Sequence, residues 1–274
     1  MAATHSSLLL LDIGNTHTHV ALARGSRFLR SVDFVTTAWR EGQAEDLLKR
    51  FLASNRLHGA AVCSVVPDVL PTAREVAQRF LGGGVVFQLT DVSARACLPL
   101  AYPRPSTLGA DRLANAIAAR HHYGAPCVAV DFGTAVTFDV VNERGCFAGG
   151  CIAPGLGLFA DYLHEKTALL PRIKVKRVTR AIARSTEKAM QAAAFVGFRG
   201  LVRELVESIR RELGRQRLPV VATGGYARLV ALRFPLITAV HPHLTLEGLR
   251  LAWAVHHGGR ENRMVRGGRG GAGT

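Results

Sequence analysis

The sequence has few of the features that mark membrane, secreted or metal-rich proteins. Its apolar runs fall short of the roughly 20 residues that a transmembrane helix needs. Its first residues, MAATHSS, lack the charged and apolar regions of a signal peptide. Its five cysteines form no CxxC pair, so a zinc site is not expected and buried free thiols are the natural interpretation. The sequence therefore predicts a protein of the reducing cytoplasm, without a membrane partner.

Acidic residues are scarce relative to basic ones. The chain has 35 Lys and Arg against 20 Asp and Glu, a formal net charge of +15, which favours anionic partners such as nucleotides, acidic metabolites or nucleic acid. Basic residues alternate with Glu over 203–217, and we recognise no cluster of them with base-reading aromatic partners. We therefore interpret most of this charge as solvated surface and expect no specific nucleic-acid partner.

The apolar pattern divides the chain into two similar halves. Each half begins with three strands and continues with helices that alternate with further strands. The proline-rich stretch 98–107 separates the halves. The sequence thus predicts a duplicated α/β chain with domains at 1–105 and 106–257, followed by a disordered Gly- and Arg-rich tail at 258–274. The predicted helices cover 44–55, 71–84, 109–124, 156–170, 186–213, 226–234 and 244–257.

Two predicted strands end in an acid, a glycine and a threonine. Asp12-Ile13-Gly14-Asn15-Thr16 closes the first, and Asp131-Phe132-Gly133-Thr134 closes a strand in the second half. Such turns offer backbone N–H groups and hydroxyls to phosphate oxygens, while an acid beside them suits Mg²⁺. One acid-glycine turn is commonly only a turn, but two of them favour hairpins that face each other across a cleft and bind a polyphosphate with its metal. A third glycine turn, 222–225, leaves room for adenine or ribose.

The stretch YPRPSTLGADRLAN (102–115) carries the candidate catalytic residues. Gly109 lets the chain turn, and Asp111 and Arg112 follow at the start of a predicted helix. Arg112 could bind a substrate carboxylate, and Asp111 could take the proton of a substrate hydroxyl. The spacing fits equally well with a second interpretation, in which Asp111 and Arg112 only stabilise the start of their helix. Similarly, Thr186 could either contact a ligand or share helix capping with Ser185.

Taken together, these motifs resemble the type III pantothenate kinases of the acetate kinase/sugar kinase/Hsp70/actin superfamily. The similarity covers residues 8–256. It rests on the ordered motifs DIGNTH, PSTLGADR, DFGTAVTFD, GGCIAPG, TGG and LEGL, together with a Thr-initiated helix that contains Gly197. The resemblance implies two RNase H-like (actin-like ATPase) domains, each a mixed five-stranded sheet with flanking helices, and a homodimer. It also implies ATP-dependent phosphorylation of pantothenate to 4'-phosphopantothenate, the first step of coenzyme A biosynthesis, with Mg²⁺ and a monovalent cation (K⁺ or NH4⁺).

The resemblance also implies roles for individual residues. Asp111 would be the general base, Asp12 would serve Mg²⁺ and Asp131 the monovalent cation. Thr186 would contact pantothenate from the partner subunit's side. The remaining expected ligands of ATP are Asp12, Gly14, Asn15, Thr16, His17, Thr134, Gly224 and Gly225, and those of pantothenate are Tyr102, Gly109, Ala110, Asp111 and Arg112.

One position departs from the family pattern, and two other functions stay open. Ala193 stands where relatives often carry glycine, which predicts a stiffer helix and altered packing against a dimer partner. The basic charge also suits a non-catalytic relative that acts as a transcription accessory protein, although such a protein would be expected to lose Asp12, Asp111 or Asp131. A kinase for another carboxylate-bearing alcohol is the third possibility.

Overall fold

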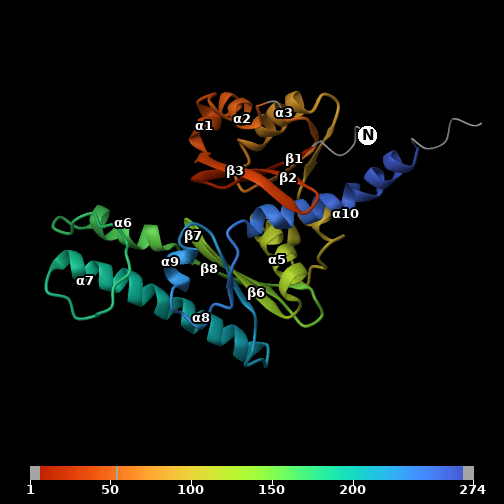
Figure 1. Cartoon of the computed structure of the whole chain (residues 1–274). Coiled ribbons are helices and arrows are strands. Elements are labelled where there is room, and N and C mark those ends of the chain that lie inside the picture. Colours follow the sequence, from red (N-terminus) through yellow and green to blue (C-terminus); the bar gives the residue numbers. More distant parts are fainter. Residues whose placement is uncertain (1–6, 54, 268–274) are drawn as a thin grey trace, which may run out of the picture. The chain divides into compact units, whose positions relative to one another are not determined.

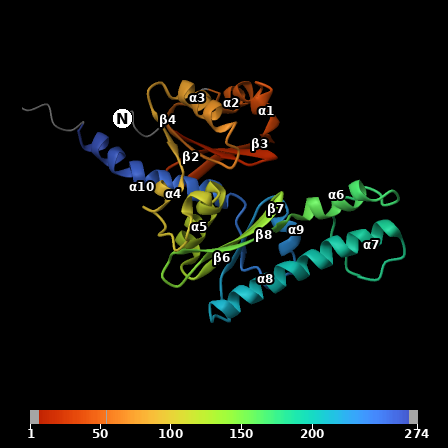
Figure 2. The same cartoon turned by 180° about the vertical axis from the view of Figure 1, so that it is seen from behind.

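The computed structural model describes residues 7–53 and 55–267, and their contacts divide the chain into two units (Figures 1 and 2). The first unit comprises the described parts of Met1–Pro99, Pro103–Ala118 and Thr245–Thr274. The second comprises Leu100–Tyr102 and Ala119–Leu244. This division differs from a single break at residue 105, because a helix from the middle of the chain and the last helix both pack within the first unit.

The first unit is built on a five-stranded sheet in the order β3-β2-β1-β4-β5. β1 pairs antiparallel with β2 and parallel with β4, so the sheet is mixed. Its elements are β1 (Ser7–Ile13), β2 (His17–Arg24), β3 (Arg27–Val35), α1 (Thr37–Arg40), α2 (Ala44–Leu52), β4 (Leu57–Ser64), α3 (Leu70–Leu81), β5 (Val85–Gln88), α4 (Asp91–Ala94), the 3₁₀ turn η1 (Pro105–Thr107), the start of α5 (Ala110–Tyr123) and α10 (Leu244–Gly267).

The second unit repeats this plan in the order β10-β9-β6-β7-β8. Here β6 pairs antiparallel with β7 and parallel with β9. Read from β8, the order corresponds strand by strand to that of the first unit, so the predicted duplicated α/β architecture is confirmed. Its elements are β6 (Cys127–Phe132), β7 (Ala135–Val141), β8 (Phe147–Pro154), α6 (Leu156–Lys166), α7 (Thr186–Ala192), the π-helical turn η2 (Ala193–Gly197), α8 (Phe198–Glu212), β9 (Val220–Thr223), α9 (Ala227–Ala231) and β10 (Ala239–Val240).

The central strand β1 explains the leucine run of the sequence. Every residue of β1 is buried, as expected for a strand that helices cover on both faces. Helices α1–α3 lie on one face, and α10 with the start of α5 lies on the other (Figures 1 and 2). Small residues bring the helices of this second face close: a Cβ on Gly248 would overlap the backbone of Ala114, and one on Gly59 would overlap the ring of Trp253.

The long helical stretch of the second unit is interrupted at Ala193. The sequence predicts one helix over 186–213 that is stiffer at Ala193, whereas the structure begins a π-helical turn there. Buried side chains follow at intervals of four from Met190 through Phe198 to Val206. A four-residue spacing drifts around a helix with 3.6 residues per turn. The wider π turn offsets part of that drift, so these side chains stay on the core face.

Helix α10 extends beyond the last predicted element. It continues to Gly267, so it includes the first part of the predicted tail at 258–274, while residues 268–274 lie outside the described residues. Among residues 7–53 and 55–267, no helix combines the length and the hydropathy that crossing a membrane requires.

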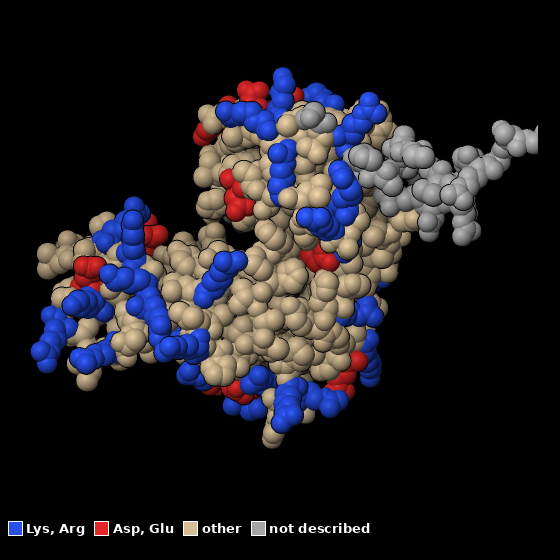
Figure 3. All heavy atoms as spheres, in the orientation of Figure 1, with Lys and Arg blue, Asp and Glu red and all other residues tan. Residues whose placement is uncertain are grey.

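Positive charge is concentrated more than the sequence analysis expected. The segment 166–188 between α6 and α8 carries eight basic residues and a single acidic one, Glu187, a formal charge of +7. Figure 3 shows Lys and Arg side chains gathered over this part of the second unit. Basic residues are therefore not confined to helices on which they alternate with Glu, and we call residues 166–188 the basic segment. Its cationic members are Lys166, Arg172, Lys174, Lys176, Arg177, Arg180, Arg184 and Lys188.

Candidate active site

The β1–β2 turn of the first unit is closed by its own backbone. The N–H of Gly14 donates to the carbonyl of His17 at 3.0 Å. Thr36 fixes the turn from outside, because its hydroxyl donates to the Gly14 carbonyl at 2.6 Å and its N–H donates to the Thr16 carbonyl at 2.9 Å. The side chains of Asn15, Thr16 and His17 are exposed. The expected phosphate-binding residues therefore stand on a supported turn with their polar groups accessible.

Asp12, at the end of β1, is buried beside a thiol. β1 and β4 run parallel with Asp12 opposite Cys63, so both side chains lie on the same face of the sheet. The Cys63 thiol donates a hydrogen bond to Oδ1 of Asp12 at 3.4 Å. Burial, with further contributions from the charges of Asp12 and Asp111, raises the pKa of the Cys63 thiol well above its ordinary value. The charges of both carboxylates thus disfavour ionisation of the same buried thiol.

Asp111 occupies the first turn of α5, where the helix N-terminus favours a negative charge. Its Oδ1 accepts a hydrogen bond from the backbone N–H of Arg112 at 2.8 Å. A Cβ on Gly109 would overlap this carboxyl group, so only glycine permits the approach. Burial raises the pKa of Asp111, although the N–H and the guanidinium of Arg112 oppose the shift. A carboxylate of raised pKa is a better base near neutral pH.

The second unit carries the corresponding turn between β6 and β7. The N–H of Gly133 donates to the carbonyl of Ala135 at 3.1 Å, and the N–H of Gly155 donates to the carbonyl of Thr134 at 2.9 Å. A Cβ on Gly155 would overlap the carbonyl oxygens of Gly133 and Thr134. The GGCIAPG motif therefore ends on a glycine that packs directly against the DFGT turn, with Thr134 exposed at its tip.

The third glycine turn lies beside Asp131. Strand β9 runs parallel to β6, with Asp131 opposite Thr223. Gly224 follows with a φ of +88°, and a Cβ there would overlap the Asp131 carboxylate. The N–H of Tyr226 donates to the Phe132 carbonyl at 3.2 Å. The ATGG and DFGT motifs thus form one connected set of turns around Asp131.

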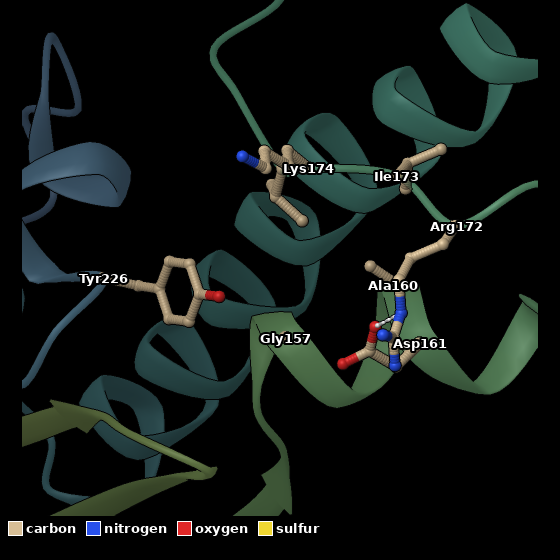
Figure 4. Close-up of a pocket in the computed structure, with 8 residues that line it drawn as sticks. Gly157, Ala160, Asp161, Arg172, Ile173, Lys174 and Tyr226 are labelled. Carbon is tan, nitrogen blue, oxygen red and sulfur yellow. Dashed lines mark ion pairs between the residues drawn. The ribbon is translucent and has the colours of Figure 1, made fainter.

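A pocket of about 620 Å³ adjoins these turns within the second unit. Figure 4 shows Tyr226 pointing its phenol toward the start of α6, and the ion pair between Asp161 and Arg172, 3.3 Å long, on another wall. The pocket combines an apolar lining with polar groups, as is typical of ligand sites. Its lining residues are Gly157, Ala160, Asp161, Arg172, Ile173, Lys174, Val175 and Tyr226.

Two expected pantothenate ligands lie within the second unit. The ring of Tyr102 packs edge-on against Phe147, with centroids 6.0 Å apart. Thr186 is the first residue of α7, and the capping oxygen is that of Ser185, which accepts from the Lys188 N–H at 3.3 Å. Because Ser185 takes the capping role, helix capping does not account for the exposed Thr186 hydroxyl.

The carboxylates suit hard cations better than a structural metal. In the described part of the chain, His, Cys, Asp and Glu nowhere gather in groups of three or more that could hold a metal ion. Asp12 is only 8% exposed and lies at a strand end next to the open turn. Mg²⁺ is commonly bound by one or two carboxylates, with water and substrate phosphates completing its ligands. The residues present fit such an ion.

Comparison with known proteins decides among the families of this fold. The sequence profile of the type III pantothenate kinases matches residues 8–208. The chain belongs to the type III pantothenate kinase family. A relative of that name from Akkermansia muciniphila is 44% identical over 244 residues, covering 89% of this chain and 97% of its own.

Solved structures support the same architecture at low sequence identity. A Campylobacter jejuni structure described as a Baf family transcriptional activator has a TM-score of 0.61 and 19% identity, covering 91% of this chain and 99% of its own. MreB 5 of Spiroplasma citri bound to AMPPNP has a TM-score of 0.51 and 14% identity, covering 94% and 99%. These likenesses concern the fold alone.

Sequence reasoning missed three contributors to these sites. Cys63 was interpreted only as a buried thiol, although its parallel pairing with the strand of Asp12 could have indicated its position. Thr36, which braces the β1–β2 turn, follows β3 without any recognisable motif. The residues of the second-unit pocket come from α6, the basic segment and the start of α9, and only their tertiary contacts bring them together.

Proposed function

We propose that this protein transfers the γ-phosphoryl group of ATP to the hydroxyl of pantothenate, giving 4'-phosphopantothenate and ADP, the first step of coenzyme A biosynthesis. The observation that supports it most is the convergence of Asp12 and Asp111 on the buried Cys63 at one end of the β1–β4 pair. A phosphotransferase needs one acid for a metal and another for the attacking hydroxyl.

In this mechanism Asp111 accepts the hydroxyl proton as the hydroxyl oxygen attacks the γ-phosphorus and the bond to the ADP oxygen breaks. The raised pKa of Asp111 suits this task. Arg112 holds the pantothenate carboxylate together with Tyr102, and the backbone at Gly109 and Ala110 shapes the site. Asp12 would serve Mg²⁺, which would supply neutralisation of the phosphate charge when bound.

The turns of both units provide the proposed nucleotide contacts. Gly14, Asn15, Thr16 and His17 contribute from the first unit, and Thr134, Gly224 and Gly225 from the second. Asp131, whose carboxylate a Cβ on Gly224 would overlap, would hold a monovalent cation, K⁺ or NH4⁺. Tyr226, which lines the second-unit pocket, directly follows Gly225 in the chain. This neighbourhood supports placing the nucleoside part of ATP at that pocket.

We further propose a homodimer in the cytoplasm. On α6 of the second unit, Leu158, Phe159 and Tyr162 are exposed, and Leu169 beyond it is 91% exposed. Exposed apolar groups of this kind commonly mark protein interfaces, and Thr186 would meet the partner's pantothenate there. The cysteines of the described chain are free thiols, which suits a reducing compartment. Light scattering should give a molar mass of twice the chain mass for the wild type. The variant Tyr162→Asp should give the mass of a monomer.

A coupled assay tests the reaction directly. Purified protein with ATP, Mg²⁺, K⁺ and pantothenate should release ADP, and mass spectrometry should detect phosphopantothenate. A panel of other hydroxy acids separates pantothenate from a different carboxylate-bearing alcohol. Absence of turnover with every acceptor would overturn the proposal.

A second candidate is a non-catalytic transcription accessory protein, and the basic segment is the observation that favours it. Eight cations within 166–188 could neutralise nucleic-acid phosphates. Asp12, Asp111 and Asp131 are nevertheless all present, which favours the kinase. Salt-sensitive DNA binding at physiological ionic strength, without any phosphotransfer, would support this alternative instead.

A further inference from the structure

The face of the first sheet that carries Asp12 presents a buried group that the proposed reaction does not use. Cys63 is 0% exposed, and its thiol donates to Asp12 from the neighbouring parallel strand at 3.4 Å. No reagent in solution reaches so enclosed a sulfur directly, so a nucleophilic or redox role does not fit. Its contact with the carboxylate is the feature that needs an explanation.

The position of Asp12 is restricted both at its backbone and at its side chain. Its backbone is fixed by pairing on both sides, opposite His19 of β2 and Cys63 of β4. The carboxylate can still rotate about its side-chain torsions, because terminal torsions of Asp are broad. A donor fixed on a central strand restricts that rotation, so the thiol helps to keep Oδ1 directed toward β4.

We propose that Cys63 is a positioning residue that orients the Asp12 carboxylate for Mg²⁺. The thiol donates to Oδ1 from the protein side, so it would help to orient the carboxylate toward Mg²⁺ and its water ligands. This inference rests on the proposed function, in which Asp12 serves Mg²⁺. A cysteine thiol is a weak donor, so its effect is a tuning of Mg²⁺ use and not an absolute requirement.

The chain supplies a matched control in Cys127. It is also 0% exposed and lies on the central strand β6 of the second unit. Burial is the main cause that raises its pKa to about 12. Replacing either cysteine removes a buried sulfur from a central strand, but only Cys63 contacts a proposed metal-binding carboxylate.

The experiment compares Cys63→Ser, which keeps a donor, with Cys63→Ala and Cys63→Val, which remove it. The variants Cys127→Ser and Cys127→Ala are the controls. Circular dichroism verifies folding, and the Val variant remains informative if the cavity in the Ala variant prevents folding. Calorimetry measures AMPPNP binding over a series of Mg²⁺ concentrations, and a kinetic assay measures the Mg²⁺ dependence of turnover.

We expect the half-saturating Mg²⁺ concentration to rise on the order of fivefold in Cys63→Ala and Cys63→Val, as for the loss of one weak hydrogen bond. Cys63→Ser should stay within about twofold of the wild type, and both Cys127 variants should be unchanged. Equal Mg²⁺ dependence in all variants would overturn the inference, as would a loss in Cys63→Ser as large as in Cys63→Ala. Failure of the wild type to phosphorylate pantothenate would instead refute the proposed function, and the calorimetric comparison would still test Cys63.

Discussion

The β1–β2 and β6–β7 hairpins share a scaffold but differ in what lies beside the acid. Asp12 stands opposite Cys63 in the neighbouring parallel strand, and Asp131 stands opposite Thr223 at the same place in the repeat. In the first unit a side chain contacts the carboxylate, whereas in the second the backbone of Gly224 approaches it. The two units thus share the strand-end acid and differ in its neighbour, which is a thiol donor beside Asp12 and the backbone of Gly224 beside Asp131.

The units also differ in chemistry, since the proposed base lies in the first unit alone. Asp111→Asn should lower turnover by about a thousandfold, within the range known for general bases, while ATP binding is retained. Because burial disfavours the ionised form of Asp111, the variant should be at least as stable as the wild type. Steady-state kinetics, calorimetry and thermal unfolding measure the three quantities, and unchanged turnover would remove the assigned role.

Replacing each strand-end acid separates the two ions. Asp12→Asn should raise the Mg²⁺ requirement, and Asp131→Asn the K⁺ requirement, each by about ten- to a hundredfold, as metal-site substitutions commonly do. Titrations of turnover with each cation, at a fixed excess of the other, measure both. The functional difference between the hairpins would be contradicted if both variants changed the same ion's dependence.

Gly224, which follows β9 beside Asp131, should tolerate a side chain less well than Gly14 of the β1–β2 turn. Gly224→Ala combines a positive φ with overlap of Asp131, whereas a Cβ on Gly14 would lie 3.1 Å from the His17 carbonyl. We expect losses in unfolding free energy of about 3 kcal/mol and about 1 kcal/mol, respectively. Urea denaturation measures both.

Gly25→Ala is the control for backbone strain, because Gly25 has a φ of +57° with nothing within 4 Å of the added Cβ. A loss of about 1 kcal/mol there would assign the excess at Gly224 to overlap with Asp131. Equal losses at Gly224 and Gly25 would contradict that assignment.

The smallest expected effects concern the two turn threonines. Thr16→Ala and Thr134→Ala each remove an exposed hydroxyl proposed to donate to a phosphate, and each should raise the KM for ATP by about fivefold. Stability should change by less than about 0.5 kcal/mol, as for most surface substitutions. An effect confined to one threonine would show that only one hairpin contacts phosphate.

Much of the fold could be predicted because its signals are local. The leucine run of β1 and the repeated order of strands and helices depend on periodicity within short windows, and both are confirmed. The π turn at Ala193 was not predicted, because it depends on the spacing of buried residues over several helical turns. The contacts also include α10 in the first unit, and only tertiary contacts show that this helix packs beside Gly59.

The candidate site was predictable in its motifs and less so in its supports. The acids and glycines stand in recognisable turns, but Thr36 and Cys63 act from strand positions that carry no motif. Ser185 and Thr186 were equivalent as capping residues in the sequence, and the backbone at the start of α7 distinguished them. The reacting groups are therefore easier to predict from the sequence than the residues that hold them in place.

The place of α10 has a consequence for synthesis of the chain. Trp253 fills the space above Gly59, and Gly248 allows the helix to touch Ala114, so the first unit to leave the ribosome lacks part of its core until the last helix has been translated. The second unit, by contrast, closes by Leu244 and contains its own complete sheet. The half of the molecule that is made first is thus completed last, and a nascent chain that stops short of α10 would leave one face of the leucine strand only partly covered.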